Sequence, residues 1–113
     1  MIYHIIHKSD WVNTFGKEFY EPSSIVKEGF IHCSPAEKIL DSCNNFFKHE
    51  TGLLILCIDE SKLRAEIKWE DLYDTGFNFP HIYGKLNKDA VIKTAEIGTD
   101  VNGEFVLPED IFI

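Results

Sequence analysis

One run of the chain, Leu53 to Asp59 (LLILCID), is almost continuously hydrophobic and ends in a single acid. A strand with one face in water alternates apolar and polar residues, whereas a strand buried on both faces is an unbroken apolar run. The run therefore predicts a central strand inside the core. The remaining segments must then cover two faces of this strand, which restricts the fold to layered arrangements around it.

The other segments mix strands with short helices. Ile2 to His7 is rich in β-branched and aromatic residues and predicts a first strand, with His4 and His7 on opposite faces because their separation is odd. Short helices are expected at 9–15, capped by Ser9 and ended by Gly16, and at 22–27. Further strands are expected at 65–69, 80–84, 90–97 and 104–107, and a loop that could act as a lid at 71–79.

A longer helix is expected from Pro35 to about His49. Four apolar residues of this segment recur at spacings of three and four and form one stripe: Ile39, Cys43, Phe46 and Phe47. Such a stripe is typical of a helix that lies on a sheet. The sequence therefore predicts one α+β domain over residues 1–113, since the chain offers no linker or repeat and its 44% hydrophobic content suffices for one core.

The stretch from Glu28 to Pro35 (EGFIHCSP) is the best candidate for a site. Gly29 can close a short helix and Ser34 can open the next one, with a short strand between them. This places His32 on a strand that faces a helix start, where backbone N–H groups favour an anionic ligand. The alternative is that Ser34 only caps the helix.

The composition limits the partners of the chain. A formal net charge of -8, with Arg64 as the one arginine, argues against a groove that follows nucleic-acid phosphates nonspecifically. Cys33, Cys43 and Cys57 are odd in number and lack metal-site spacing, so a reducing cytoplasm is the expected location. No run is long enough to span a membrane, and no membrane partner is expected.

Three histidines on predicted strands, His4, His32 and His81, are candidates to meet in one pocket. Their spacings match no metal-binding motif, so we expect no metal there, although a zinc site is the third alternative. Imidazoles can instead bind a ribose hydroxyl or act as general acid or base. Each one taken alone is also compatible with a hydrogen-bonded core histidine.

A carboxylate and several aromatic side chains complete the candidate set. Glu70 ends a predicted strand, where it could stabilise a cationic transition state, although most acids at strand ends are solvated surface. Tyr83, close to His81 in PHIYG, is the preferred residue to stack on a planar ring or donate a hydroxyl. Tyr3, Tyr20 and Trp11 are further candidates for stacking.

Taken together, several short segments make residues 2–97 resemble the bacterial domain-of-unknown-function family numbered 952: IYHI, EGFIHCS, LLILCID, IKWE and FPHIYGKL. The resemblance implies the fold of the ADP-ribosyltransferases, a small α+β body with a split, strongly bent sheet and short helices packed on it. In the enzymes of that fold the cleft binds NAD. The family itself implies no activity.

The order of the segments is also similar to that of the RNA 2'-phosphotransferases, which use NAD to remove a phosphate. The matching positions are Tyr3, His4, Gly29, His32, Ser34, Ile58 and Asp59. This resemblance implies that His4 contacts the ribose beside nicotinamide and that His32 faces the phosphates or the acceptor. Two departures weaken it: Ile5 and Ile6 follow His4 where the enzymes often have small residues, and the arginines around the acceptor phosphate are missing.

The leading hypothesis is an enzyme that transfers ADP-ribose from NAD, with a small-molecule nucleotide as partner and an acceptor that the sequence does not identify. Its expected catalytic residues are His4, His32, Glu70 and His81, and its expected nucleotide-binding residues are Tyr3, His4, Ser34 and Tyr83. The alternative is a module that binds a nucleotide or metabolite without converting it. The large residue Ile5 and the missing arginines favour that alternative.

Overall fold

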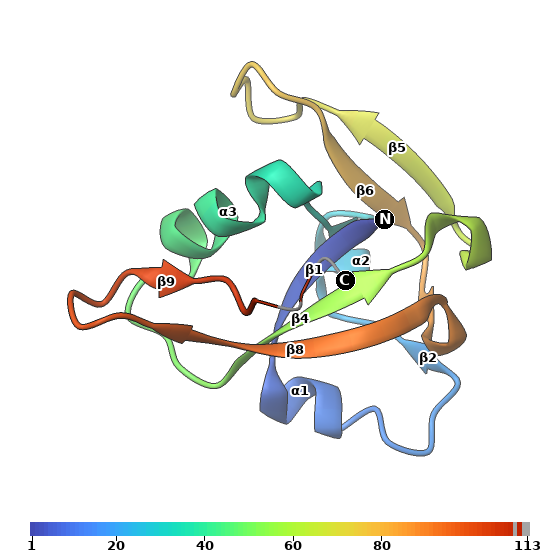
Figure 1. Cartoon of the computed structure of the whole chain (residues 1–113). Coiled ribbons are helices and arrows are strands. Elements are labelled where there is room, and N and C mark those ends of the chain that lie inside the picture. The colour runs from blue at the N-terminus through green and yellow to red at the C-terminus, as the bar shows by residue number, and fades with distance from the viewer. Residues whose placement is uncertain (110, 112–113) are drawn as a thin grey trace.

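The computed structural model describes residues 1–109 and 111, and it contains three antiparallel sheets and a few short helices (Figure 1). The strands are β1 (Ile2–His7), β2 (Phe19–Tyr20), β3 (Ile31–His32), β4 (Leu53–Ile58), β5 (Glu66–Glu70), β6 (Phe79–Tyr83), β7 (Leu86–Asn87), β8 (Val91–Thr99) and β9 (Phe105–Val106). The helices are α1 (Lys8–Val12), α2 (Ser24–Lys27) and α3 (Ile39–Phe46), with single 3-10 turns at Ala36–Lys38, Glu60–Lys62 and Lys88–Ala90.

The largest sheet has the strand order β1-β4-β8-β9, and β4 lies between β1 and β8 (Figure 1). Every residue of β4 is buried. The prediction of a central strand at this position is therefore confirmed. Its two faces look onto separate clusters of buried side chains, as an unbroken apolar strand requires.

Two different layers cover the faces of this sheet. On one face Ile39 and Cys43 of α3 pack with Ile55 and Phe105, and the amide of Phe105 donates to the side chain of Asn44 at 3.1 Å. The other face packs against the second sheet, of order β3-β6-β5, and against the β2-β7 pair. Figure 1 shows the β5-β6 hairpin standing away from the large sheet. The α+β class and the split, curled sheet are thereby confirmed.

A short bridge joins the two main sheets. The amide of Tyr3 in β1 donates to the carbonyl of Ser34 at 2.9 Å, and the amide of Ser34 donates back to Tyr3 at 2.7 Å. Beyond this bridge β1 and the chain after β3 have no further pairing in the described part. The sheets therefore separate along the second half of β1.

Several predicted details were wrong. Helix α1 begins at Lys8 rather than with Ser9 as its cap, and it ends at Val12 before a turn that closes at Gly16. The expected helix from Pro35 becomes a 3-10 turn followed by the two turns of α3. Its end follows two adjacent asparagines, which are poor helix formers, and Phe46 at that end is 74% exposed rather than packed on the sheet.

Two further features concern the cysteines and the predicted absence of a membrane-spanning segment. All three cysteines are buried. No helix within residues 1–109 has the length and apolar content needed to cross a bilayer.

Candidate functional site

A cleft of about 1330 Å³ opens where the two main sheets separate. Its walls are β1 from Tyr3 onward, the connection from α1 to α2, the end of β3, one side of α3 and the β5-β6 hairpin. The three histidines predicted to converge, His4, His32 and His81, all line it, and so does Glu70. The volume exceeds the usual range of about 300–1,000 Å³ for small-ligand pockets, so the cleft accommodates an extended ligand.

One edge of β1 forms part of this cleft. Alternate residues of a strand direct their backbone groups to opposite sides, and Tyr3 directs its own to Ser34 rather than to β4. Ile5 and His7 therefore direct their N–H and C=O groups to the same side as Tyr3. The N–H and C=O groups of Ile5 pair with no strand in residues 1–109 and 111, and Ile5 lines the cleft.

His4 is held by two contacts at the floor of the cleft. Its Nδ1 lies 2.6 Å from the carbonyl oxygen of His32, which can only accept, so Nδ1 carries the hydrogen. Nε2 is then the acceptor, and the hydroxyl of Tyr20 donates to it at 3.4 Å. Burial lowers the pKa of His4 to about 4, and burial raises that of Tyr20 to about 12. Both groups are therefore neutral at neutral pH.

Glu70 receives two hydrogen bonds on one oxygen at the end of β5. The Nδ1–H of His81 donates to Oε2 of Glu70 at 2.8 Å, and the hydroxyl of Tyr83 donates to the same oxygen in a shorter contact. These two donors, Tyr83 first, lower the pKa of Glu70 below its usual range, while the carboxylate raises the pKa of Tyr83 to about 12. Glu70 is thus an oriented anion at the rim of the cleft.

His32 forms a second histidine–carboxylate pair. Its Nε2 lies 2.7 Å from Oε2 of Glu28, and its ring stacks on Tyr73 at 6.0 Å with an interplanar angle of 23°. Phe30 contacts the rings of both His32 and His81, at 4.8 and 4.4 Å between centroids. The structure therefore brings the two pairs together around one aromatic side chain.

Two residues expected to bind a nucleotide are largely buried. Tyr3 is 4% exposed and belongs to the core cluster under α3, and Ser34 is 6% exposed. The hydroxyl of Ser34 bonds that of Ser42 at 2.8 Å, and the 3-10 turn at Ala36–Lys38 has no side-chain cap from Ser34. Tyr3 and Ser34 join the two sheets through their backbones, and both also contribute to the lining of the cleft.

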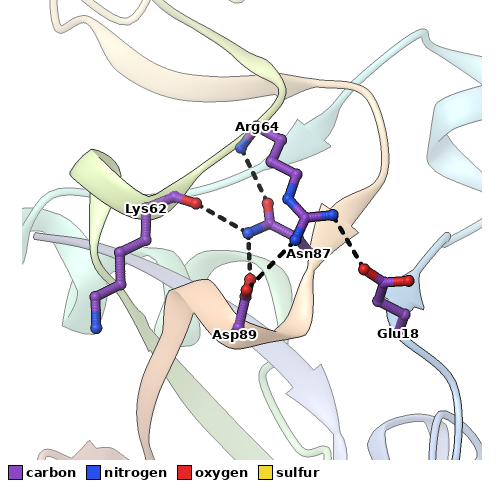
Figure 2. A network of polar contacts seen from close by, with 5 residues as sticks. All are labelled: Glu18, Lys62, Arg64, Asn87 and Asp89. Carbon is purple, nitrogen blue, oxygen red and sulfur yellow. Dashed lines mark hydrogen bonds and ion pairs between the residues drawn. The ribbon is translucent and has the colours of Figure 1, made fainter.

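The single arginine lies away from the cleft. Figure 2 shows the guanidinium of Arg64 between Glu18 and Asp89, with Nη1 3.0 Å from Glu18 and Nη2 3.5 Å from Asp89. Its backbone amide donates to the buried side chain of Asn87 at 3.0 Å. This network ties β2, the turn after β4 and β7 together. Arg64 is therefore a structural residue and does not line the described cleft.

The charges that do line the cleft are mostly acidic. The carboxylates are Asp10, Glu21, Glu28, Asp41 and Glu70, against the two lysines Lys17 and Lys38. Among residues 1–109 and 111, no three His, Cys, Asp or Glu side chains are grouped closely enough to hold a metal ion.

The roles of Glu28 and Tyr73 were not predicted from the sequence. Glu28 precedes His32 by four residues, but a turn and a strand separate them, so the helical pairing rule for that spacing does not apply. Tyr73 belongs to the loop predicted as a lid, and no local pattern indicates that this loop returns to β3.

Comparisons with known proteins find relatives without an assigned activity. A family model described as "Protein of unknown function (DUF952)" matches residues 5–94. The crystal structure of protein CC0527 from Caulobacter crescentus is 27% identical, with a TM-score of 0.83 over 94% of this chain and 93% of that chain. The solution NMR structure of CC0527 is 27% identical, with a TM-score of 0.77 over 90% and 88% of the two chains. No curated protein sequence matches the chain.

Proposed function

The chain belongs to the DUF952 family, whose description assigns no activity, and from that premise we propose that it binds NAD in the cleft and transfers the ADP-ribosyl group to an acceptor. The resemblance to the ADP-ribosyltransferases gives the class of reaction. The residues of the cleft give the reasons that follow.

The observation that carries the proposal is the anchored carboxylate of Glu70. Breaking the bond between ribose and a positively charged nicotinamide ring leaves positive charge on the sugar, and a fixed anion lowers the energy of that state. Glu70 is ionised at neutral pH, and two hydrogen bonds lower its pKa further and fix its orientation. Its side chain is 24% exposed, so one part of the carboxylate remains available to a ligand.

The free edge of β1 fits the carboxamide of nicotinamide. A primary amide has one acceptor oxygen and a donor NH₂ group, and the backbone of Ile5 offers a donor and an acceptor in return. Edge strands recognise extended ligands through such main-chain bonds. Because backbone groups do the recognition here, the branched side chain of Ile5 does not by itself exclude the ligand.

The acidic cleft favours one end of NAD over the other. The nicotinamide ring of NAD is cationic and suits a cleft that carries Glu28 and Glu70, whereas the two phosphates have only Lys17 and Lys38 among its lining cations. The residues therefore fit NAD best at its nicotinamide ribose. We assign His4 to orient that ribose through the hydroxyl network it shares with Tyr20.

His81 has a different role from the one expected. Its side chain is 2% exposed, so it lacks the surface to touch a ligand. We assign it, with Tyr83, to hold Glu70 in place as a positioning residue.

A second candidate is a module that binds a nucleotide or metabolite and leaves it intact. It is favoured by the absence of arginine from the described lining of the cleft, since transferases that act on phosphorylated acceptors rely on arginine clamps. The two candidates differ in whether the glycosidic bond of NAD is broken.

Calorimetric titration with NAD, ADP-ribose and nicotinamide, followed by chromatography of the recovered nucleotide, tests the proposal. We expect NAD to bind and to release nicotinamide slowly, and Glu70→Gln to bind NAD with similar affinity but to release nicotinamide about 100-fold more slowly. Glu37→Gln, outside the cleft lining, is the matched control. Intact NAD after binding supports the second candidate, and absence of NAD binding overturns the proposed transferase.

A further inference from the structure

The Glu28–His32 pair resembles an oriented base more than an ordinary surface ion pair. A carboxylate that accepts from Nε2 fixes the neutral imidazole in the Nε2–H form and leaves the lone pair on Nδ1. His32 makes no hydrogen bond through Nδ1 within residues 1–109 and 111. The nitrogen that can take up a proton is therefore unoccupied by another side chain.

Exposure distinguishes the two histidine–carboxylate pairs of the cleft. The side chains of His32 and Glu28 are each 43% exposed, whereas that of His81 is 2% exposed. A general base must come within hydrogen-bond reach of the proton it removes. Of the two histidines, His32 is the one whose ring a ligand can contact.

The groups around His32 indicate what kind of acceptor fits beside it. Tyr73 stacks on its ring, and Leu72 and Phe77 of the same loop also line the cleft at about half exposure. Glu28 brings a negative charge next to the imidazole, and Lys38 already lies over the ring of Phe77, 3.5 Å from its centroid. An uncharged or cationic molecule with an apolar part suits this surface better than a phosphate.

Resting on the proposed function, we infer that His32 is the general base that activates the hydroxyl of a neutral or cationic alcohol as the acceptor, and that Glu28 positions it. The acceptor O–H bond breaks and its proton passes to Nδ1 of His32. The acceptor oxygen bonds to the anomeric carbon of the ribose, whose bond to nicotinamide breaks. The electron pair of that bond stays with the ring nitrogen, so nicotinamide leaves as a neutral molecule.

Two simple acceptors, methanol and azide, distinguish a role of His32 as general base from a purely structural role. Methanol must lose a proton when it becomes an acceptor, whereas azide needs none. For His32→Gln we expect transfer to methanol to fall about 100-fold while transfer to azide changes less than about threefold. Calorimetry with NAD should give a dissociation constant within about twofold of that of the wild type. His49→Asn is the control, because His49 lies outside the cleft lining and asparagine tolerates its left-handed backbone (φ 69°).

The tautomer of His32 provides a readout that does not depend on turnover. At alkaline pH, ¹⁵N NMR of the wild type should show hydrogen on Nε2 only, and Glu28→Leu should show a mixture of both forms. A mixture already present in the wild type overturns the positioning role of Glu28.

The outcomes distinguish this inference from the proposed function. If wild-type protein binds NAD and releases nicotinamide, but His32→Gln lowers transfer to methanol and azide equally or to neither, only the role of His32 is overturned. If wild-type protein binds no NAD, the proposed function fails and the inference fails with it.

Discussion

Tyr83 of β6 donates its hydroxyl hydrogen to Oε2 of Glu70, the last residue of β5. β5 and β6 pair antiparallel with Tyr83 opposite Glu66 and Glu70 opposite Phe79, so this contact joins residues four positions apart along the hairpin. The contact lowers the pKa of the acid and raises that of the phenol, so both groups are fixed in the protonation states that keep the bond.

Replacing Tyr83 with phenylalanine should raise the pKa of Glu70, since this hydroxyl is the largest cause of its lowering. The pKa of Glu70 is lower in the folded protein than in the unfolded chain, where a glutamate has a pKa of about 4.3. Its ionised form therefore stabilises the fold at pH values above about 4.3, and this stabilisation is lost as the pH falls through the pKa of the folded state. The stability difference between wild type and Tyr83→Phe should therefore be largest near neutral pH and shrink in acid. Carboxyl ¹³C NMR measures the titration directly, with Tyr73→Phe as the control. An unchanged midpoint in Tyr83→Phe contradicts the assignment.

His4 should make the protein less stable as the pH falls, whereas a histidine paired with an acid makes a protein more stable as the pH falls. Burial lowers its pKa to about 4, so below about 6.5 the unfolded chain binds a proton that the folded chain does not. Stability should fall as the pH drops from about 6.5 to about 4, by about 2 kcal/mol between pH 7.5 and pH 5. Urea unfolding of wild type and His4→Gln at both pH values isolates this contribution. The variant should show a pH dependence smaller by that amount, and equal dependences contradict the prediction.

The sequence predicted those parts of the fold that depend on local pattern. The unbroken apolar run predicted the central position of β4. The odd separation of His4 and His7 in IYHIIH predicted that they lie on different faces of the strand, and the two residues have different partners. Those patterns follow from burial, which acts on each strand separately.

Contacts between distant segments could not be predicted in the same way. Ser34 has the sequence context of a helix cap, yet its backbone bonds to Tyr3 and its hydroxyl to Ser42 once the sheets meet. Phe46 fits the apolar stripe of α3, but it is exposed and lines the cleft. Tertiary packing decides both, and no spacing within the chain reports it.

Asn87 should matter more to stability than the charged residues around it. It is 1% exposed, donates to the carbonyl of Lys62 at 2.9 Å and accepts from the amide of Arg64 (Figure 2). Asn87→Ala leaves both backbone groups unsatisfied and should lower the free energy of unfolding by about 2–4 kcal/mol. Arg64→Ala removes exposed ion pairs with Glu18 and Asp89 and a contact with the ring of Phe19, and should cost less than about 1 kcal/mol. Urea unfolding of both variants checks the order, and a larger loss in Arg64→Ala contradicts it.

Removing one backbone donor at the edge of β1 should test carboxamide recognition without removing a side chain that the ligand contacts. Ile5→Pro deletes the N–H that faces the cleft, and proline is tolerated on an edge strand when its nitrogen is not part of the ladder. One lost hydrogen bond should weaken binding of NAD and nicotinamide about tenfold. ADP-ribose lacks the carboxamide, so its affinity should stay the same.

Ile5→Val is the matched control for this variant, because it keeps the N–H and shortens the side chain, which packs in the core under α3. We expect Ile5→Val to bind all three ligands as the wild type does, in calorimetric titrations at one pH. If Ile5→Pro weakens ADP-ribose as much as NAD, the substitution has disturbed the cleft as a whole and the edge of β1 is not the carboxamide site. If it weakens neither, the nicotinamide ring binds elsewhere in the cleft, away from the edge where the two sheets separate.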